Sequence, residues 1–508
     1  MKSTAPTEVV IRTGLGFLIK DSFVYGGAAA ISQAFSLITF PLLTRHFSVA
    51  EYGTLDYFMV LGSFFVTFFI FGQDSGVARY FYEYEGRKER CQIISESLVL
   101  QLTGLVLILP LLWMAADWLA ALFEGTFSVR LFKIVLLQIP FLLLINFSLN
   151  LLKWTFERNQ YLIMSIGFTV VRASVFAGAL LAFDVGIEEV LLISLATSAV
   201  FAVFGVFLVR GWLMRPTNFR YSSELLRFSI PIGFICALGA FSPTLERTLT
   251  EQLLGAGDLG LYSAGIKIAM LIGLMAGAFQ TAWGPFSLSI HKLADAGQSY
   301  NWVLKLFAMF MCVMVLALNV LAQPLINLLA SDRYAGAAIV VFPLAMGMAI
   351  EATSWITEIG IGISKRSHLN LYGYALFVVT TLACILFLAP ALGLLGLALG
   401  VMIGHIAKAF LNSWLAQRAY PLPWHYGQVL AVFGFTMVVG SVSIGIGQFW
   451  MAGPNIGVLS AGIIALLGLG WGVLLNASER QLAIAYMRKQ FSKARCASKL
   501  NPSLNKKK

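Results

Sequence analysis

Hydrophobic positions along the chain fall into long continuous runs of about 20 residues. A helix rises about 1.5 Å per residue, so one such run crosses a hydrocarbon core of roughly 30 Å. Backbone groups in lipid must bond within the protein, and a closed barrel would need short alternating strands instead. The pattern therefore predicts an all-α polytopic membrane protein. Its predicted spans lie near residues 22–44, 55–78, 93–115, 130–151, 162–183, 187–209, 226–250, 259–288, 302–322, 336–360, 369–389, 392–416, 427–448 and 455–476.

Composition agrees with this pattern. The chain is 59% hydrophobic and 12% charged, whereas a soluble domain carries about 25% charged residues. The net charge of +11 would suit a nucleic-acid partner in a soluble protein, but here the distribution of cations among the loops explains it. The five cysteines are scattered, without a Cys-x-x-Cys pair or a histidine cluster, so the sequence predicts no metal, no cofactor and no disulfide framework.

Loops on alternate sides of the predicted spans differ in charge, which fixes an orientation. The positive-inside rule assigns the basic loops to the cytoplasm. An even number of spans then places both termini there. The basic loops carry Arg79, Arg87, Lys88, Arg90, Lys153, Arg158, Arg210, Arg215, Arg220, Arg227, Lys292, Lys305, Lys365, Arg366 and Arg418. The opposite loops carry four cations, Arg45, Arg130, Lys133 and Arg333, and the acids Glu51, Asp117, Glu124, Asp184, Glu188, Glu189, Glu251, Asp258 and Asp332.

A faint internal repeat organises the spans. A shift of 207 positions superposes Glu51-Tyr52-Gly53 on Asp258-Leu259-Gly260. Each repeat holds six spans, so the halves share one orientation, as in transporters built from parallel repeats. The predicted division is a cytoplasmic N-terminus (1–21), an N-lobe (22–215), a C-lobe (216–425), two accessory helices (426–478) and a basic cytoplasmic tail (479–508).

Ionisable residues inside the predicted spans are candidates for function, because a charge at the middle of a bilayer costs several kcal/mol. Arg172 and Glu351 lie near mid-span, whereas Arg247 and Lys267 lie in the outer third. Structural ion pairing is the alternative for each of them. The candidates for a substrate cavity are Arg172, Arg247, Lys267, Glu246 and Glu351, and those for ion coupling or ion pairs between the lobes are Asp74, Glu358, Lys408 and His405.

Several motifs resemble the polysaccharide-transporter and O-antigen flippase family of the multidrug/oligosaccharidyl-lipid/polysaccharide superfamily. The first is Pro41-Leu42-Leu43-Thr44-Arg45, followed by Ala50-Glu51-Tyr52-Gly53. The second is Phe71-Gly72-Gln73-Asp74-Ser75-Gly76. The third is Arg227-Phe228-Ser229-Ile230-Pro231, followed by Glu246-Arg247, where the family usually has Asp-Arg.

This resemblance implies two six-helix lobes around a central cavity that opens alternately to the two sides of the cytoplasmic (inner) membrane. The implied cargo is a polyprenyl-pyrophosphate-linked oligosaccharide for surface polysaccharide biosynthesis. A proton or sodium gradient, or the membrane potential, would drive the transport, and the chain has no Gly-x-x-x-x-Gly-Lys-Ser/Thr loop for ATP. Membrane lipids and a polymerase or glycosyltransferase assembly are the further partners expected, and nucleic acid is not.

Other hypotheses for the function are compatible with the sequence. A multidrug/cation antiporter or a peptidoglycan-precursor flippase of the same superfamily would show a similar pattern of spans. A membrane glycosyltransferase, polymerase or ligase would need a substantial loop outside the membrane, and the outer loops here are short. A scaffold without transport activity would not need charges within the membrane in both halves. We therefore expect a transporter, not an enzyme.

Overall fold

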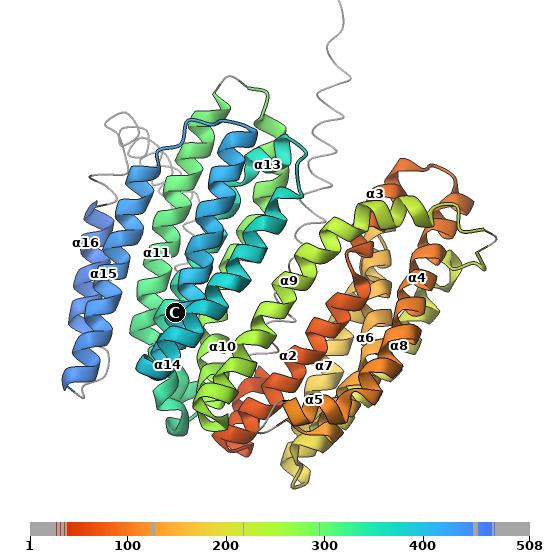
Figure 1. The fold of residues 1–508 in the computed structure, drawn as a ribbon, viewed down its shortest axis with the longest axis horizontal. Coiled ribbons are helices and arrows are strands. Elements are labelled where there is room, and N and C mark those ends of the chain that lie inside the picture. The colour runs from red at the N-terminus through yellow and green to blue at the C-terminus, as the bar shows by residue number, and fades with distance from the viewer. Residues whose placement is uncertain are drawn as a thin grey trace, which may run out of the picture. The chain divides into compact units, whose positions relative to one another are not determined.

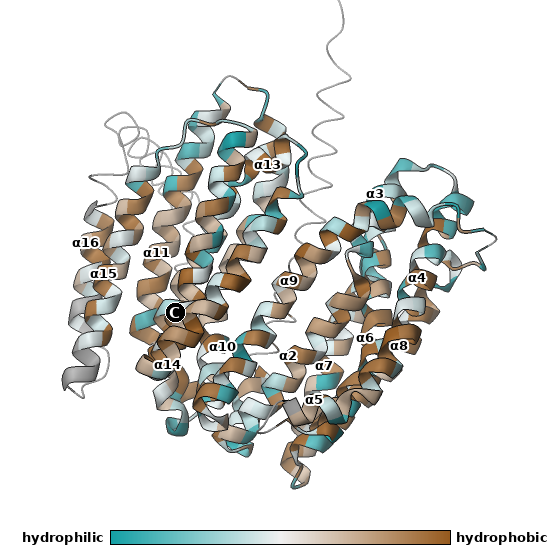
Figure 2. Cartoon of the chain, in the orientation of Figure 1, coloured by the Kyte–Doolittle hydropathy of each residue, from teal (hydrophilic) through white to brown (hydrophobic). Residues whose placement is uncertain are grey.

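The computed structural model of this protein describes residues 27, 31, 35, 38–122, 127–216, 218–293, 295–450, 456–469 and 472. Within these residues the secondary structure is helical, and eleven helices are long and apolar enough to cross a membrane. The chain is thus a multi-pass α-helical membrane protein. Figure 2 shows hydrophobic residues along the helices and hydrophilic residues gathered at helix ends and connecting segments. The predicted span at 22–44 lies largely outside the described residues, whereas the span at 455–476 is described over residues 456–469 and at 472.

The chain divides into two compact units. One unit comprises residues 1–293 and 321–422, and the other comprises residues 294–320 and 423–508. The main helices of the first unit are α2 (Val49–Ile70), α3 (Gln73–Glu83), α4 (Arg87–Met114), α5 (Ala116–Leu122), α6 (Val129–Trp154), α7 (Arg158–Ala182), α8 (Ile187–Val209), α9 (Ser222–Leu254), α10 (Ala256–Ile290), α12 (Ala338–Thr357), α13 (Ile359–Ile363) and α14 (Leu369–Ala419). The short 3-10 helices η1 (Arg210–Trp212) and η2 (Asp332–Ala337) complete it.

Helix α2 begins earlier than the hydrophobic run predicts, because its first turn is capped. Ser48 accepts a hydrogen bond from the backbone of Glu51, and the Glu51 carboxylate accepts one from the backbone of Ser48. This capping box satisfies backbone donors that would otherwise stay unpaired at the helix start. The helix ends at Phe71 and Gly72, whose φ angles of 44° and 71° interrupt the predicted span before α3. Gly72 lies against the backbone of Gly233 in α9, with only 2.6 Å between the Gly233 nitrogen and an added β-carbon.

Helix α14 comprises two predicted spans that meet in a sharp turn. Gly393 has a φ of 60° and non-helical geometry between the two arms, residues 369–392 and 394–419. A β-carbon added at Gly404 would lie 2.0 Å from Thr381 Oγ1, and one at Gly400 would lie 2.9 Å from Ile385. The arms therefore pack antiparallel, as the two predicted spans 369–389 and 392–416 require.

Helix α9 is continuous, although Pro231 and Pro243 lie inside it. It contacts α2, α3 and α4 from the first half of the chain and α10 and α14 from the second half. In Figure 1 this long helix, in yellow-green, runs beside α2. Helix α9 therefore packs against helices of both halves of the chain.

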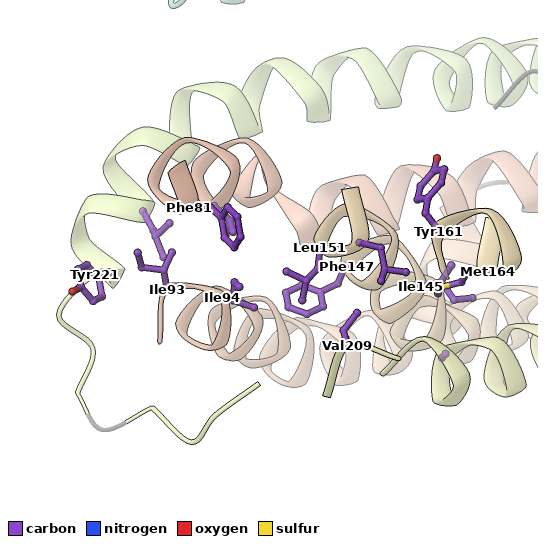
Figure 3. Close-up of a cluster of buried hydrophobic side chains, with 14 residues drawn as sticks. Phe81, Ile93, Ile94, Ile145, Phe147, Leu151, Tyr161, Met164, Val209 and Tyr221 are labelled. Carbon is purple, nitrogen blue, oxygen red and sulfur yellow. The ribbon is translucent and has the colours of Figure 1, made fainter. Parts of the chain in front are cut away.

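Equivalent helices pack in the same way in the two halves of the sequence. The fourth and sixth predicted spans become α6 and α8, which pack together, and the tenth and twelfth become α12 and the second arm of α14, which also pack together. A buried hydrophobic cluster joins the N-terminal helices (Figure 3). It consists of Val77, Phe81, Ile93, Ile94, Ile145, Phe147, Leu151, Leu152, Tyr161, Met164, Ala202, Val209, Tyr221 and Leu225.

The second unit contains α15 (Tyr426–Trp450), α16 (Ile456–Leu469) and the first part of α11 (Ala296–Leu329). Asn301 on α11 donates to the carbonyl of Pro423 and accepts from the backbone of His425. The rings of Tyr300 and Trp424 stack with their centroids 6.3 Å apart. These contacts fasten α11 to the segment that leads into α15.

Candidate functional site

A pocket of about 160 Å³ lies among membrane-spanning helices of the first unit. Three of its lining residues carry charges: Asp56 from α2, Arg172 from α7 and Lys267 from α10. With a rise of about 1.5 Å per residue, each lies about 10–17 Å along its helix from the end that the loop charges predict to be outside. The remaining lining residues are Phe35, Thr39, Phe40, Leu43, Tyr52, Leu55, Met59, Thr169, Ala173 and Phe176.

Arg172 has no acidic partner within ion-pair distance in the part of the chain that the structure describes. Its guanidinium carbon lies 5.0 Å from the centroid of the Phe168 ring, one turn earlier on α7. That cation–π contact offsets part of the cost of desolvation but supplies no negative charge. Arg172 is thus a cation available to an anion that enters the pocket.

Asp56 joins the first half of the chain to two cations of the second half. Arg247 Nε donates to Asp56 Oδ2 at 2.7 Å, and each of these two side chains is 4% exposed. Lys267 Nζ lies 3.6 Å from Asp56 Oδ1, with its side chain 29% exposed. Arg247 also donates to the carbonyl of Pro243 at 3.0 Å. Arg247 is therefore held within the protein, while Lys267 borders the pocket.

Glu246 faces away from the pocket lining and binds within the helix bundle. Its Oε2 accepts from the Tyr262 hydroxyl at 2.6 Å, and its Oε1 accepts from the Ser242 hydroxyl at 2.9 Å. Successive helical positions point about 100° apart, which separates Glu246 from Arg247. Glu246 fastens α9 to α10 beside the Asp56–Arg247 pair.

A second charged cluster joins α12 to the second arm of α14. Glu351 pairs with Lys408 through Oε1, and its Oε2 lies 3.1 Å from His405 Nδ1. Lys408 is 2% exposed, and its Nζ lies 3.6 Å from the centroid of the Tyr374 ring. The partner of Lys408 therefore comes from the same half of the chain. Glu351 does not line the pocket of Arg172 and Lys267.

Glu358 and Asp74 occupy separate positions. Glu358 accepts from the Ser354 hydroxyl at 2.8 Å and from Asn412 at 3.1 Å, so it extends the contact between α12 and α14. Asp74 accepts from the backbone of Ser75 at 2.8 Å, in the first turn of α3. It borders a smaller cavity beside Ser97. Among the described residues, no group of three or more metal-ligating side chains comes together.

Glu96 is a structural acid that no sequence pattern predicts. This residue is fully buried on α4 and accepts from the backbone of Tyr221 and the hydroxyl of Ser222, both at 2.9 Å. A carboxylate at a helix start compensates unpaired backbone donors and the helix dipole. Glu96 therefore anchors the start of α9 from another helix, a relation that sequence spacing does not reveal.

The fold defines a polytopic α-helical membrane protein with a charged pocket among its helices. The profile described as polysaccharide biosynthesis protein matches residues 18–291, more than half of the chain. The chain belongs to this family. "Lsg locus putative protein 1" of Haemophilus influenzae is 26% identical over 56% of this chain and 70% of its own length. An uncharacterized membrane protein of the same organism is 25% identical over 53% of this chain and 65% of its own length.

Solved structures resemble this fold at low sequence identity. The lipid II flippase MurJ in an inward closed conformation gives a TM-score of 0.68 at 13% identity, covering 88% of this chain and 97% of its own. An inward-facing multidrug resistance MATE transporter of the MOP superfamily gives 0.59 at 15% identity, covering 76% and 94%. These likenesses establish the fold, and the family match assigns this chain to the polysaccharide biosynthesis proteins.

Proposed function

We propose that this protein flips a lipid-linked oligosaccharide, or a related polysaccharide precursor, across the cytoplasmic membrane by alternating access. The family description supports a role in polysaccharide biosynthesis. The likeness to a lipid II flippase supports a fold able to move a lipid carrying a large polar head group. Such a head group cannot cross hydrocarbon unaided, so the protein must replace its water.

The observation that supports this proposal most is Arg172, which has no acidic partner among the described residues and lies in the pocket that Lys267 also lines. Together with the Asp56–Arg247 pair, these cations leave an excess of positive charge. A phosphate or acidic sugar of the cargo would supply the missing anion, and a guanidinium can bind it through two parallel hydrogen bonds. A cationic drug would be repelled there, which favours a glycan carrier over a drug antiporter.

Ion coupling belongs to the same proposal. The Glu351–His405–Lys408 cluster and Glu358 hold titratable groups between α12 and α14, away from the pocket lining. A proton or sodium ion bound there would alter how tightly the two helices associate, because it changes the charge of their contact. Both termini face the cytoplasm in this proposal, as the basic loops predict.

The test is complementation of a strain that lacks its own surface-polysaccharide flippase. Arg172→Ala and Lys267→Ala should each lower glycan export at least about tenfold, since each removes a charged hydrogen bond worth about 1.5–3 kcal/mol. Arg130→Ala is the matched control, because Arg130 pairs with Glu188 in an exposed position outside the pocket. Normal export by well-expressed Arg172→Ala and Lys267→Ala variants would refute this assignment.

A further inference from the structure

The contact between α2 and α10 has a feature that the transport proposal does not explain. Gly53 and Gly260 are equivalent positions of the repeat, and they touch. A β-carbon added at Gly53 would lie 2.5 Å from the nitrogen of Gly260, and one added at Gly260 would lie 1.9 Å from the carbonyl oxygen of Val49. Contact between equivalent positions places this seam on the local two-fold axis that relates the halves. Any opening between the halves at this end must separate it.

Asp56 lies one turn beyond this seam and is the acid that bridges it. The bridge has two unequal arms. The 2.7 Å bond to Arg247 joins two nearly inaccessible side chains, whereas the 3.6 Å contact with Lys267 involves a side chain that is 29% exposed and borders the pocket. Lys267 can therefore leave Asp56 and bind an anion in the pocket. Arg247 cannot leave Asp56 unless the surrounding helices separate.

We propose that Asp56 stands in for the anionic group of the cargo: it binds Lys267 and keeps this end of the pocket closed while the pocket is empty. An incoming phosphate held by Arg172 competes with the Asp56 carboxylate for Lys267. When Lys267 turns to the phosphate, one of the two ion pairs across the seam is lost and the halves separate more easily. Asp56 is thus a positioning residue that links occupancy of the pocket to opening. This inference rests on the proposed function for the nature of the cargo.

The proposal predicts how labelling of a pocket residue depends on charge. Met59 lines the pocket beside Asp56, so Met59→Cys, in a chain whose five native cysteines are replaced, reports access. An impermeant maleimide is applied to vesicles on the face where α2 and α10 begin, with and without inorganic pyrophosphate on both sides. Labelling should be low without pyrophosphate and rise about tenfold with it, as expected when a minor open state becomes populated.

Three variants separate competition from simple packing. Asp56→Asn should label strongly without pyrophosphate, and Asp56→Glu should restore the low level and its response. Lys267→Gln should label more strongly than the parent without pyrophosphate and respond little to it, because the pair between Asp56 and Lys267 is already lost and the anion has no lysine to bind. Glu188→Gln, which removes an ion pair elsewhere on the same predicted side, should behave as the parent. A purely structural Asp56 would not produce this dependence on pyrophosphate.

Two results would overturn the inference. The first is weak labelling of Asp56→Asn; if that variant does not fold, Asp56→Asn combined with Arg247→Gln removes both buried charges and should label strongly. The second is unchanged labelling of Met59→Cys although pyrophosphate binds, as shown by an increase in thermal stability that requires Arg172. Absence of any such stabilisation would instead refute the proposed function, and the competition together with it.

Discussion

Two helix pairs of this protein have the same packing and opposite chemistry. In the first half, α6 and α8 are joined by a neutral network in which Gln138 donates to Ser194 at 2.7 Å and to Ser198 at 3.0 Å. In the second half, α12 and the second arm of α14 are joined by the charged cluster of Glu351, His405 and Lys408. The repeat thus preserves how the helices pack and leaves the polar groups free to differ.

The difference has an energetic meaning. Amide and hydroxyl groups within a bundle stabilise helix contacts modestly, by about 0.6 kcal/mol for each hydrogen bond in membrane proteins. Charges desolvated in the same setting cost several kcal/mol and are rarely retained for packing alone. Leu143, which stands 208 positions before Glu351, is apolar and fully buried. The second half therefore carries charges that its packing does not require, which directs the search for ion coupling to that half.

Removing Lys408 should produce the largest effect on stability. Lys408→Met leaves the Glu351 carboxylate without its ammonium partner inside the protein, and breaking a buried pair costs about 3–5 kcal/mol. Thermal unfolding in detergent measures the loss. The double variant Lys408→Met/Glu351→Leu should recover most of it, since no buried charge then lacks its partner. If Lys408→Met is as stable as the parent, the cluster of Glu351, His405 and Lys408 is solvated, and the two helix pairs do not differ in the way described.

Adding one methyl group to each pair should give a smaller and unequal effect. Gly347→Ala places a β-carbon 2.9 Å from His405 Cδ2 and 3.3 Å from the backbone of Met402. We expect a cost of about 1–3 kcal/mol, typical of an overpacked contact, together with displacement of the imidazole from Glu351. The matched Gly205→Ala in α8 meets the flexible end of Met164 at 2.4 Å and Ser148 Oγ at 2.9 Å. It should cost less, because the methionine can turn aside; equal unfolding temperatures for both variants would contradict this.

Replacing the neutral network should have the smallest effect. Gln138→Leu removes two hydrogen bonds while keeping the volume of the side chain, so stability should fall by about 1 kcal/mol. Glycan export should stay near the parental level, since Gln138 has no titratable group. Comparing the glycan export of Gln138→Leu with that of Glu351→Gln tests the difference between the two helix pairs most directly. A loss of export in Gln138→Leu equal to that in Glu351→Gln would mean that the neutral pair also serves transport.

Much of the site was predictable residue by residue, but its connections were not. Depth along a span drew attention to Arg172 and Lys267, and the structure places both in the lining of one pocket. Their positions inside the predicted spans also grouped Glu246, Arg247 and Glu351 with this pair. The structure gives Glu246 and Arg247 partners within the bundle and places Glu351 in another cluster. Asp56 was not among the residues predicted for the site, and its main partner, Arg247, stands 191 positions away in the chain.

The sequence by itself determined that this protein spans a bilayer. It also determined the spacing of the helices and the loops that carry cations. These properties follow from local hydrophobicity and charge, which require no knowledge of neighbours. The tertiary structure decided which charges meet. Ion pairing depends on distances of a few ångströms between segments far apart in the chain, so only the packing of α2, α9 and α10 shows that Arg247 is committed to Asp56. The same packing leaves Arg172 without an acidic partner among the described residues.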